Sequence, residues 1–291
     1  MNRIYYQIQG GLGNQLFIIA FAISQALRHP EKKIYLDPCK YFLKKIHEGY
    51  LLKDLISQCS SQLPNPVDHS LFSTVIFSFL NKISLLNQNY IFHHEDEPYV
   101  FQNIAIKSEN TFLFGYWQSY KYFFENSNYI KKIILDFIKT HQSSDKMGIA
   151  QNKNLYPQVA IHVRRGDYVK LKSYGLLSKD YYQKAIKYFQ KELPNAQFLV
   201  FSDQPNNIKN ENLFECPVIY IQPQNSSINE LYLMSQCDHF ITANSSFSWW
   251  GAYLGENTSK IILTPKKWFK DRESRRDFIP PDWILIDNEL A

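Results

Sequence analysis

Apolar and polar residues follow one another along this chain in blocks that predict strands and helices in turn. Residues 3–9 (RIYYQIQ) predict a buried strand, the apolar run 15–27 predicts a helix, and 34–37 predict a second strand. A strand, a glycine-rich loop, a helix and another strand are typical of a βαβ unit in a parallel sheet. Residues 40–102 mix helical patches with polar breaks, and there we expect helices and long loops.

A second α/β alternation follows a polar segment at 141–158, which we interpret as an interdomain linker. Its predicted strands are 159–163, 198–202, 218–221, 240–242 and 260–263, and its predicted helices are 181–192, 228–237 and 248–254. We therefore expect an α/β fold of two domains, 1–145 and 146–291, that face each other across a cleft. In such a fold ligands bind at the carboxyl ends of the strands.

Composition and charge narrow the classes of function. The 291 residues are 45% apolar, which suits two packed cores and excludes wholesale disorder. The formal net charge of +5 favours anionic partners, such as sugar nucleotides or an acidic membrane face. We find neither a basic stripe nor a motif typical of nucleic-acid binding, so we expect no nucleic-acid partner.

The cysteines and the N-terminus indicate the compartment. The four cysteines are scattered without C-x-x-C spacing and predict buried thiols in a reducing environment. The N-terminus lacks a signal-peptide pattern, and no stretch is long enough to span a bilayer. We therefore expect a cytoplasmic protein, with at most a peripheral contact at the inner membrane.

Glycines fill the first predicted strand-to-helix junction, at residues 10–15 (GGLGNQ). No Lys-Ser/Thr follows, and Leu16 stands in place of a third glycine, so the segment is neither a P-loop nor a full dinucleotide fingerprint. Glycine lets the backbone approach a ligand closely, and a helix N-terminus offers N–H groups to an anion. A plain tight turn is the alternative. The residues that we expect to contact an anionic ligand are Gly11, Leu12, Gly13 and Asn14.

Two arginines and a histidine lie at the end of a predicted strand, in segment 160–168 (AIHVRRGDY). Strand alternation places His162 and Arg164 on one face and Arg165 on the other. Arginine binds phosphate through a rigid fork and keeps its charge at any working pH, so we expect Arg164 and Arg165 to contact the diphosphate of a ligand. A salt-bridged surface turn would explain one arginine more readily than this cluster.

Two further strand ends carry polar residues. Asp203 follows strand 198–202, where its carboxylate can accept hydrogen bonds from ribose hydroxyls or guanine N–H groups, or else cap a helix. Residues 241–251 (ITANSSFSWWG) lead from a strand into an aromatic helix, and their hydroxyls and N–H groups would complete a second anion cradle. Simple capping would not need three serines and an asparagine so close together.

Metal binding finds little support in the sequence. The run 93–97 (HHEDE) is the best candidate, but adjacent residues point in different directions. No Asp-x-Asp motif is present to hold a divalent ion under a diphosphate. We therefore expect no metal and no other cofactor.

Taken in order, these segments resemble those of the bacterial and animal galactoside α1,2-fucosyltransferases, glycosyltransferase family 11. The shared segments are GGLGNQLF at 10–17, GYWQSYKYF at 115–123, HVRRGDY at 162–168, FSD at 201–203, ELYLMSQC at 230–237, NSSFSWWGAYL at 244–254, PKKWF at 265–269 and IPPDW at 279–283. They cover nearly the whole chain and are highly specific together.

The resemblance implies a GT-B-type fold of two Rossmann-like domains. It also implies a metal-independent, inverting enzyme that moves L-fucose from GDP-β-L-fucose to the 2-hydroxyl of a terminal galactose. Arg164 would bind the β-phosphate and stabilise the departing GDP, His162 would contact the donor beside it, and Asp203 would hold guanine or ribose. The further donor contacts that it implies are Ser245, Ser246 and the Phe247 backbone for phosphate, and Gly13 and Asn14 for pyrophosphate or fucose.

Several positions depart from the family pattern. They are Ile18-Ile19 in place of Gln-Tyr, Tyr120 where Glu is frequent, Tyr174-Gly175 in place of His-Gly, and Gln204 where a second Asp is common. The last leaves base recognition more dependent on Asp203. The general base stays open among Asp37, Glu48, residues 95–97 and a donor phosphate oxygen.

Two alternatives also stay open: a transferase with another linkage or nucleotide sugar, and a non-catalytic sugar-binding protein. Family habit suggests a bacterial surface glycan, such as O-antigen or lipopolysaccharide, as the setting. The oligomeric state is not predicted.

Overall fold

The computed structural model describes residues 3–43, 48–60, 63, 67–69, 90–96, 99–104, 106, 110–141, 156–169, 173–271 and 276–290. The chain divides into two units, Met1–Phe137 with Arg275–Ile279, and Ile138–Ser274 with Pro280–Ala291. The sequence predicts a division after residue 145 and does not predict that Arg275–Ile279 belongs with the first unit. Most of the linker predicted at 141–158 lies outside the described residues.

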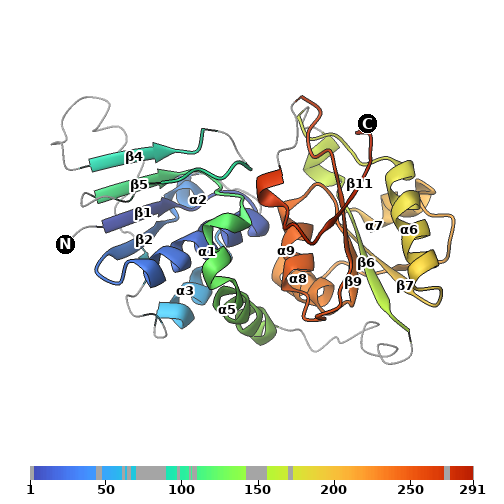
Figure 1. The fold of residues 1–291 in the computed structure, drawn as a ribbon, viewed down its shortest axis with the longest axis horizontal. Coiled ribbons are helices and arrows are strands. Elements are labelled where there is room, and N and C mark those ends of the chain that lie inside the picture. The colour runs from blue at the N-terminus through green and yellow to red at the C-terminus, as the bar shows by residue number, and fades with distance from the viewer. Residues whose placement is uncertain are drawn as a thin grey trace. The chain divides into compact units, whose positions relative to one another are not determined.

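The first unit contains a parallel sheet with the described strands in the order β3-β2-β1-β5-β4 (Figure 1). Its elements are β1 (Arg3–Gln7), α1 (Leu12–Arg28), β2 (Lys33–Asp37), α2 (Cys39–Leu43), α3 (Lys53–Ser60), β3 (Val67–His69), β4 (Tyr90–His94), β5 (Asn110–Phe114), η1 (Tyr120–Tyr122), η2 (Phe124–Asn126), α5 (Ser127–Thr140) and η4 (Arg276–Phe278). The central strand β1 is buried on both faces from Ile4 to Gln7, as is typical of the middle of a parallel sheet. Helix α1 begins three residues earlier than predicted, which places Gly13 and Asn14 in its first turn. Within 40–102 the structure has strands β3 and β4 where the sequence predicts helices and loops.

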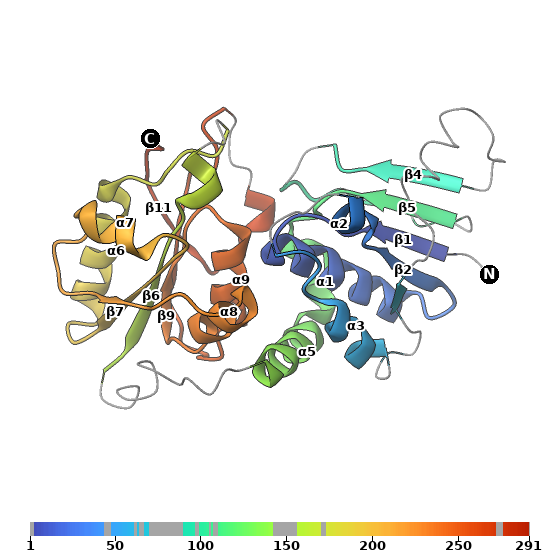
Figure 2. The same ribbon diagram turned by 180° about the vertical axis from the view of Figure 1, so that it is seen from behind.

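The second unit also contains a parallel sheet, in the order β11-β10-β9-β6-β7-β8 (Figure 2). Its elements are β6 (Gln158–Val163), η3 (Gly166–Val169), α6 (Lys179–Glu192), β7 (Gln197–Ser202), α7 (Pro205–Asn210), β8 (Ile219–Tyr220), α8 (Ser227–Ser235), β9 (His239–Ile241), α9 (Ser246–Leu254), β10 (Ile262–Pro265) and β11 (Ile284–Ile286). Every strand and helix predicted in this half is present within two residues of its predicted bounds. The predicted α/β class and the two Rossmann-like sheets of a GT-B-type chain are thereby confirmed.

The strand orders place a topological switch point in each sheet. In the second unit the chain starts at β6, moves outward through β7 and β8, and returns to β9 on the other side of β6. In the first unit the chain moves from β1 outward through β2 and β3, passes to the far edge at β4 and comes back to β5, so the change of side falls between β1 and β5. At such a point the connections leave on opposite sides, and the carboxyl ends of the two strands are open to a ligand.

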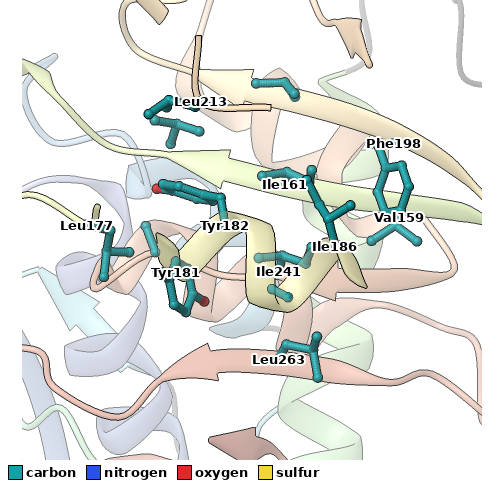
Figure 3. Close-up of a cluster of buried hydrophobic side chains, with 14 of the residues drawn as sticks. Val159, Ile161, Leu177, Tyr181, Tyr182, Ile186, Phe198, Leu213, Ile241 and Leu263 are labelled. Carbon is teal, nitrogen blue, oxygen red and sulfur yellow. The ribbon is translucent and has the colours of Figure 1, made fainter. Parts of the chain in front are cut away.

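Helix α6 packs against the second sheet and holds the carboxyl ends of β6 and β9. Figure 3 shows its Tyr181 and Tyr182 among the apolar side chains of the strands. Both rings are fully buried, and both hydroxyls donate to strand-end carbonyls: Tyr181 to Thr242 at 2.6 Å and Tyr182 to His162 at 3.2 Å. A buried tyrosine needs such a partner, so these bonds fix the two strand ends while the rings fill the core.

Two further observations bear on the sequence predictions. All four cysteines are free, and of these Cys59 and Cys237 are buried while Cys39 and Cys216 are half-buried. Within the described part of the chain, no helix combines the length and the apolar character that crossing a bilayer requires.

Candidate active site

The predicted site residues of the second unit lie around its switch point. Arg164 directly follows β6, Asp203 directly follows β7, and Ser245 is the N-cap of α9 just after β9. These three strands are neighbours and parallel, so their carboxyl ends share one edge of the sheet. Segments that are about 40 residues apart in sequence are thus brought together as the strand pattern predicts.

Arg164 is held on two sides. Its Nη1 lies 3.1 Å from Asp203 Oδ2, and its guanidinium lies over the Tyr168 ring, 5.4 Å from the centroid. Tyr168 in turn donates its hydroxyl to the Asn244 carbonyl at 3.0 Å, which joins the β6 loop to the turn before α9. The side chains of Arg164 and Asp203 are each 23% exposed, so the cation is oriented but still reaches solvent.

Asp203 also orders the backbone of the arginine loop. Its Oδ1 accepts from the Arg165 N–H at 3.0 Å, and a Cβ on Gly166 would lie only 2.3 Å from its Oδ2. A side chain at position 166 would therefore have to displace this carboxylate from its contacts with Arg164 and Arg165. Asp203 engages both arginine residues, a role that the sequence does not predict for it.

The Arg165 side chain is buried and already bound to a carboxylate of the protein. Its side chain is packed against Glu211, with Nε 3.0 and 3.1 Å from the two carboxylate oxygens and Nη2 2.7 Å from Oε2. Such a bidentate pair satisfies a buried guanidinium. The structure thus presents Arg164, and not Arg165, to a ligand at this edge. The sequence predicts that the two residues point in opposite directions, but it does not identify Glu211.

The turn before α9 uses much of its polar content internally. The buried Asn244 amide donates to the carbonyls of Tyr174, Gly175 and Trp268, at 3.1 to 3.3 Å. Ser245 caps the helix by accepting from the Phe247 N–H at 3.3 Å. Simple capping and loop closure therefore explain part of the polar run.

Ser246 and Phe247, the first two residues of α9, are half-buried, so the start of the helix is partly accessible to solvent. The positive end of the α9 dipole adjoins the strand edge that carries Arg164, and together they favour an anion. The anion cradle itself stays a prediction.

His162 is a buried, neutral imidazole. Only 2% of its surface is exposed, and its ring centroid lies 5.5 Å from that of Phe247. Burial, reinforced by the charge of Arg164, lowers its pKa to about 3. At neutral pH it can therefore donate one hydrogen bond but carries no charge.

The glycine loop of the first unit lies at the other switch point. Gly10 has a φ of +79°, and a Cβ there would meet the Asn14 side chain at 2.4 Å, so this turn requires glycine. Gly11 caps α1 without a side-chain acceptor, which leaves the helix start to the backbone alone. Asn14 accepts from the Gln118 amide at 2.7 Å, which links the helix start to the turn after β5.

Glu95 organises that turn, a role the sequence does not predict. It follows β4 and accepts from the backbone N–H groups of Tyr116 at 2.7 Å and Trp117 at 3.1 Å. Burial raises its pKa to about 7, opposed by these hydrogen bonds. Trp117 has a φ of +53°, a conformation that this carboxylate helps to hold.

Among the described residues, no three His, Cys, Asp or Glu side chains gather as metal ligands would.

Comparisons with known proteins identify the family of the chain. The chain belongs to glycosyl transferase family 11, whose model matches residues 74–287, and this confirms the family that its motifs resemble. The protein is therefore a glycosyltransferase.

Among its relatives, the chain is 29% identical over 300 residues to the alpha-1,2-colitosyltransferase of Escherichia coli, covering 99% of this chain and 100% of that protein. It is 29% identical to the Escherichia coli O-antigen biosynthesis glycosyltransferase WbnK, covering 91% and 95%. It is 31% identical to the galactoside 2-alpha-L-fucosyltransferase of Caenorhabditis elegans, covering 58% and 50%. Among solved structures, it is similar to the fucosyltransferase NodZ from Bradyrhizobium, with a TM-score of 0.45 and 14% identity over 86% of this chain and 92% of that one.

Proposed function

We propose that this glycosyltransferase moves L-fucose from GDP-β-L-fucose to the 2-hydroxyl of a terminal galactose, in α1,2 linkage and without a metal ion. The observation that carries the proposal is Arg164 beside the N-terminus of α9, at the switch point of the second sheet. Oriented donors at this edge suit the negative charge of a nucleoside diphosphate. The names of two relatives support the linkage, since both carry the words alpha-1,2 or 2-alpha.

The reaction is a single displacement. The galactose 2-hydroxyl attacks C1 of fucose, the bond from C1 to the phosphate oxygen breaks, and GDP leaves with the bonding electrons. The 2-hydroxyl proton passes to a base on the enzyme or to a donor phosphate oxygen. Negative charge builds on the leaving diphosphate, and Arg164 with the first N–H groups of α9 would stabilise it.

The other predicted donor contacts then take distinct parts. Neutral His162 would donate a hydrogen bond without adding charge, and Ser245 and Ser246 would contact phosphate through their hydroxyls. The Phe247 N–H would join them by exchanging its 3.3 Å bond to Ser245 for one to phosphate. Asp203 would orient Arg164 through its 3.1 Å contact and use its exposed edge for guanine or ribose. Arg165, bound to Glu211, would hold the loop rather than touch the donor. A contact of the glycine loop, residues 11–14, with pyrophosphate or fucose stays a prediction.

Colitose is a second candidate for the transferred sugar, because a relative matched over 99% of this chain is named a colitosyltransferase. Colitose is L-fucose without its 3-hydroxyl, so the two donors share the GDP group and the anomeric centre. A site that hydrogen-bonds the 3-hydroxyl would prefer fucose strongly, since loss of such a partner leaves a buried polar group unsatisfied.

The test is a competition between donors. Wild-type protein is incubated with a galactoside and equal amounts of GDP-fucose and GDP-colitose, and the products are separated by mass, while GDP and UDP are compared as inhibitors. The proposal predicts fucosylated product and inhibition by GDP at a much lower concentration than UDP. If only colitosylated product forms, colitose and not fucose is the transferred sugar. Stronger inhibition by UDP than by GDP would overturn the donor assignment.

A further inference from the structure

The first unit carries a second group of side chains that the donor site does not use. Tyr41 lies on α2, Tyr50 lies in the loop before α3, and His69 ends β3. The Tyr41 and Tyr50 rings are stacked with centroids 6.1 Å apart, and the Tyr50 and His69 rings lie edge to face at 5.5 Å. All three residues are half-buried, so the rings form a surface at the carboxyl edge of the sheet and are not core. We call these three residues the tyrosine platform.

The tyrosine platform is held in place by buried hydrogen bonds. Gln15, which is fully buried, donates to the Gly49 carbonyl at 2.8 Å and accepts from the Leu51 N–H at 3.1 Å. These two bonds fix the backbone on both sides of Tyr50. Tyr41 donates its hydroxyl to the Gly10 carbonyl at 2.5 Å, so one edge of the platform joins the glycine loop. A surface loop fixed by a buried amide is pre-organised, and pre-organisation lowers the cost of binding.

The edges of the platform are polar and largely neutral. The Tyr50 hydroxyl lies 2.9 Å from His69 Nε2, and the Lys40 ammonium donates to Gln9 Oε1 at 2.5 Å. Burial lowers the pKa of His69, so its ring is neutral at pH 7. Flat aromatic faces with hydrogen-bonding edges suit a pyranose, which has apolar C–H faces and a rim of hydroxyls.

We infer that the tyrosine platform, with Lys40 at its rim, binds the terminal galactose of the acceptor glycan. The inference rests on the proposed function, which assigns the nucleotide to the second unit and leaves the acceptor sugar without a site. The axial 4-hydroxyl of galactose leaves one face of C–H groups free to stack on a tyrosine ring. Its equatorial hydroxyls would then reach the His69 and Lys40 edges.

The test compares Tyr50→Phe, which removes only the hydroxyl, with Tyr50→Ala, which removes the ring. Tyr35→Phe is the matched control, because Tyr35 is a half-buried tyrosine of β2 outside the platform. The KM for lactose, the KM for GDP-fucose and kcat are measured for each protein. Lactose binding without donor is followed by saturation-transfer NMR.

Tyr50→Phe removes the hydroxyl that orients His69 toward the sugar. The loss of one net hydrogen bond from His69 to galactose, about 0.5–1.5 kcal/mol, should raise the KM for lactose about two- to tenfold. Tyr50→Ala should raise it more and abolish the lactose NMR signal. The KM for GDP-fucose should stay within about twofold, and the control should match the wild type on every measure.

An unchanged KM for lactose in both variants, or a rise confined to GDP-fucose, would overturn the platform as the acceptor site. A wild type that transfers from no donor would instead overturn the proposed function, and lactose binding would still decide the platform. Loss of the lactose signal in Tyr50→Ala would then support it, and equal signals in wild type and variant would refute it.

Discussion

His162 should make the second unit sensitive to acid. In the folded protein burial and Arg164 hold its pKa near 3, whereas in the unfolded chain a histidine titrates near 6.5. Below pH 6.5 the unfolded state therefore binds a proton that the folded state does not, and stability falls as pH falls. The linkage relation with these two pKa values gives a loss of about 2 kcal/mol at pH 5 and about 3 kcal/mol at pH 4.

The assay is urea unfolding at pH 7 and pH 5, read by tryptophan fluorescence. Four of the five tryptophans, at positions 249, 250, 268 and 283, belong to the second unit, so its transition dominates the signal. His162→Gln removes the titrating group, and its stability difference between the two pH values should be about 2 kcal/mol smaller than in the wild type. Comparing differences within each protein cancels any loss of packing that the substitution causes at both pH values. His141→Gln, at an exposed position, is the control. A His162→Gln protein that loses as much stability as the wild type would refute the buried neutral imidazole.

Three further substitutions probe the remaining parts of the structure. Arg164→Lys keeps the charge but loses the fork, and should lower kcat by about 10²–10³ with an unchanged melting temperature, whereas near-normal turnover would remove Arg164 from the leaving-group role. Gly166→Ala places a Cβ 2.3 Å from Asp203 Oδ2 and should lower kcat/KM for the donor at least about tenfold. In a protein that already carries Asp203→Ala, the same substitution should have almost no further effect, and additive losses would contradict the shared contact. Because burial raises the pKa of Glu95 to about 7, the folded first unit retains a proton between pH 4.5 and 7 and loses stability as pH rises through that window. Glu95→Gln should flatten this trend in hydrogen exchange of the Tyr116 amide, and an unchanged slope would count against the raised pKa.

The second unit could be predicted well because its local patterns agree with its fold. Its strands are short apolar runs bounded by polar residues, and each predicted one is present. Arg164 and Asp203 each follow such a run directly, and parallel strands bring their carboxyl ends to one edge. Chain order and strand pattern were therefore sufficient to gather these residues.

The first unit was harder for physical reasons. Strand β4 reads YIFHH, and its two histidines interrupt the apolar pattern that would predict a strand in a stretch where we expect helices and loops. The segment forms a strand because it pairs with β5, where His94 stacks on Phe114 with ring centroids 4.7 Å apart. A pairing of this kind depends on a neighbour about 20 residues away, which no local periodicity reports.

Polar partners that are far apart in the chain could not be predicted from the sequence either. Arg165 and Glu211 are 46 residues apart in sequence, and Glu95 and Tyr116 are 21 apart. A lone glutamate gives no local sign that it will meet a buried guanidinium or a set of backbone N–H groups. Such partners follow from the tertiary arrangement, and they separate the arginine that holds the loop from the one that reaches a ligand.

The most direct test of the account is the product formed from GDP-fucose and lactose in the presence of EDTA, with its linkage assigned by NMR. The account predicts L-fucose in α linkage on the 2-hydroxyl of galactose, formed at a rate that EDTA does not change. If the protein neither transfers fucose to lactose nor binds GDP detectably, the assignment of the donor site around Arg164 is contradicted, and the proposed function with it.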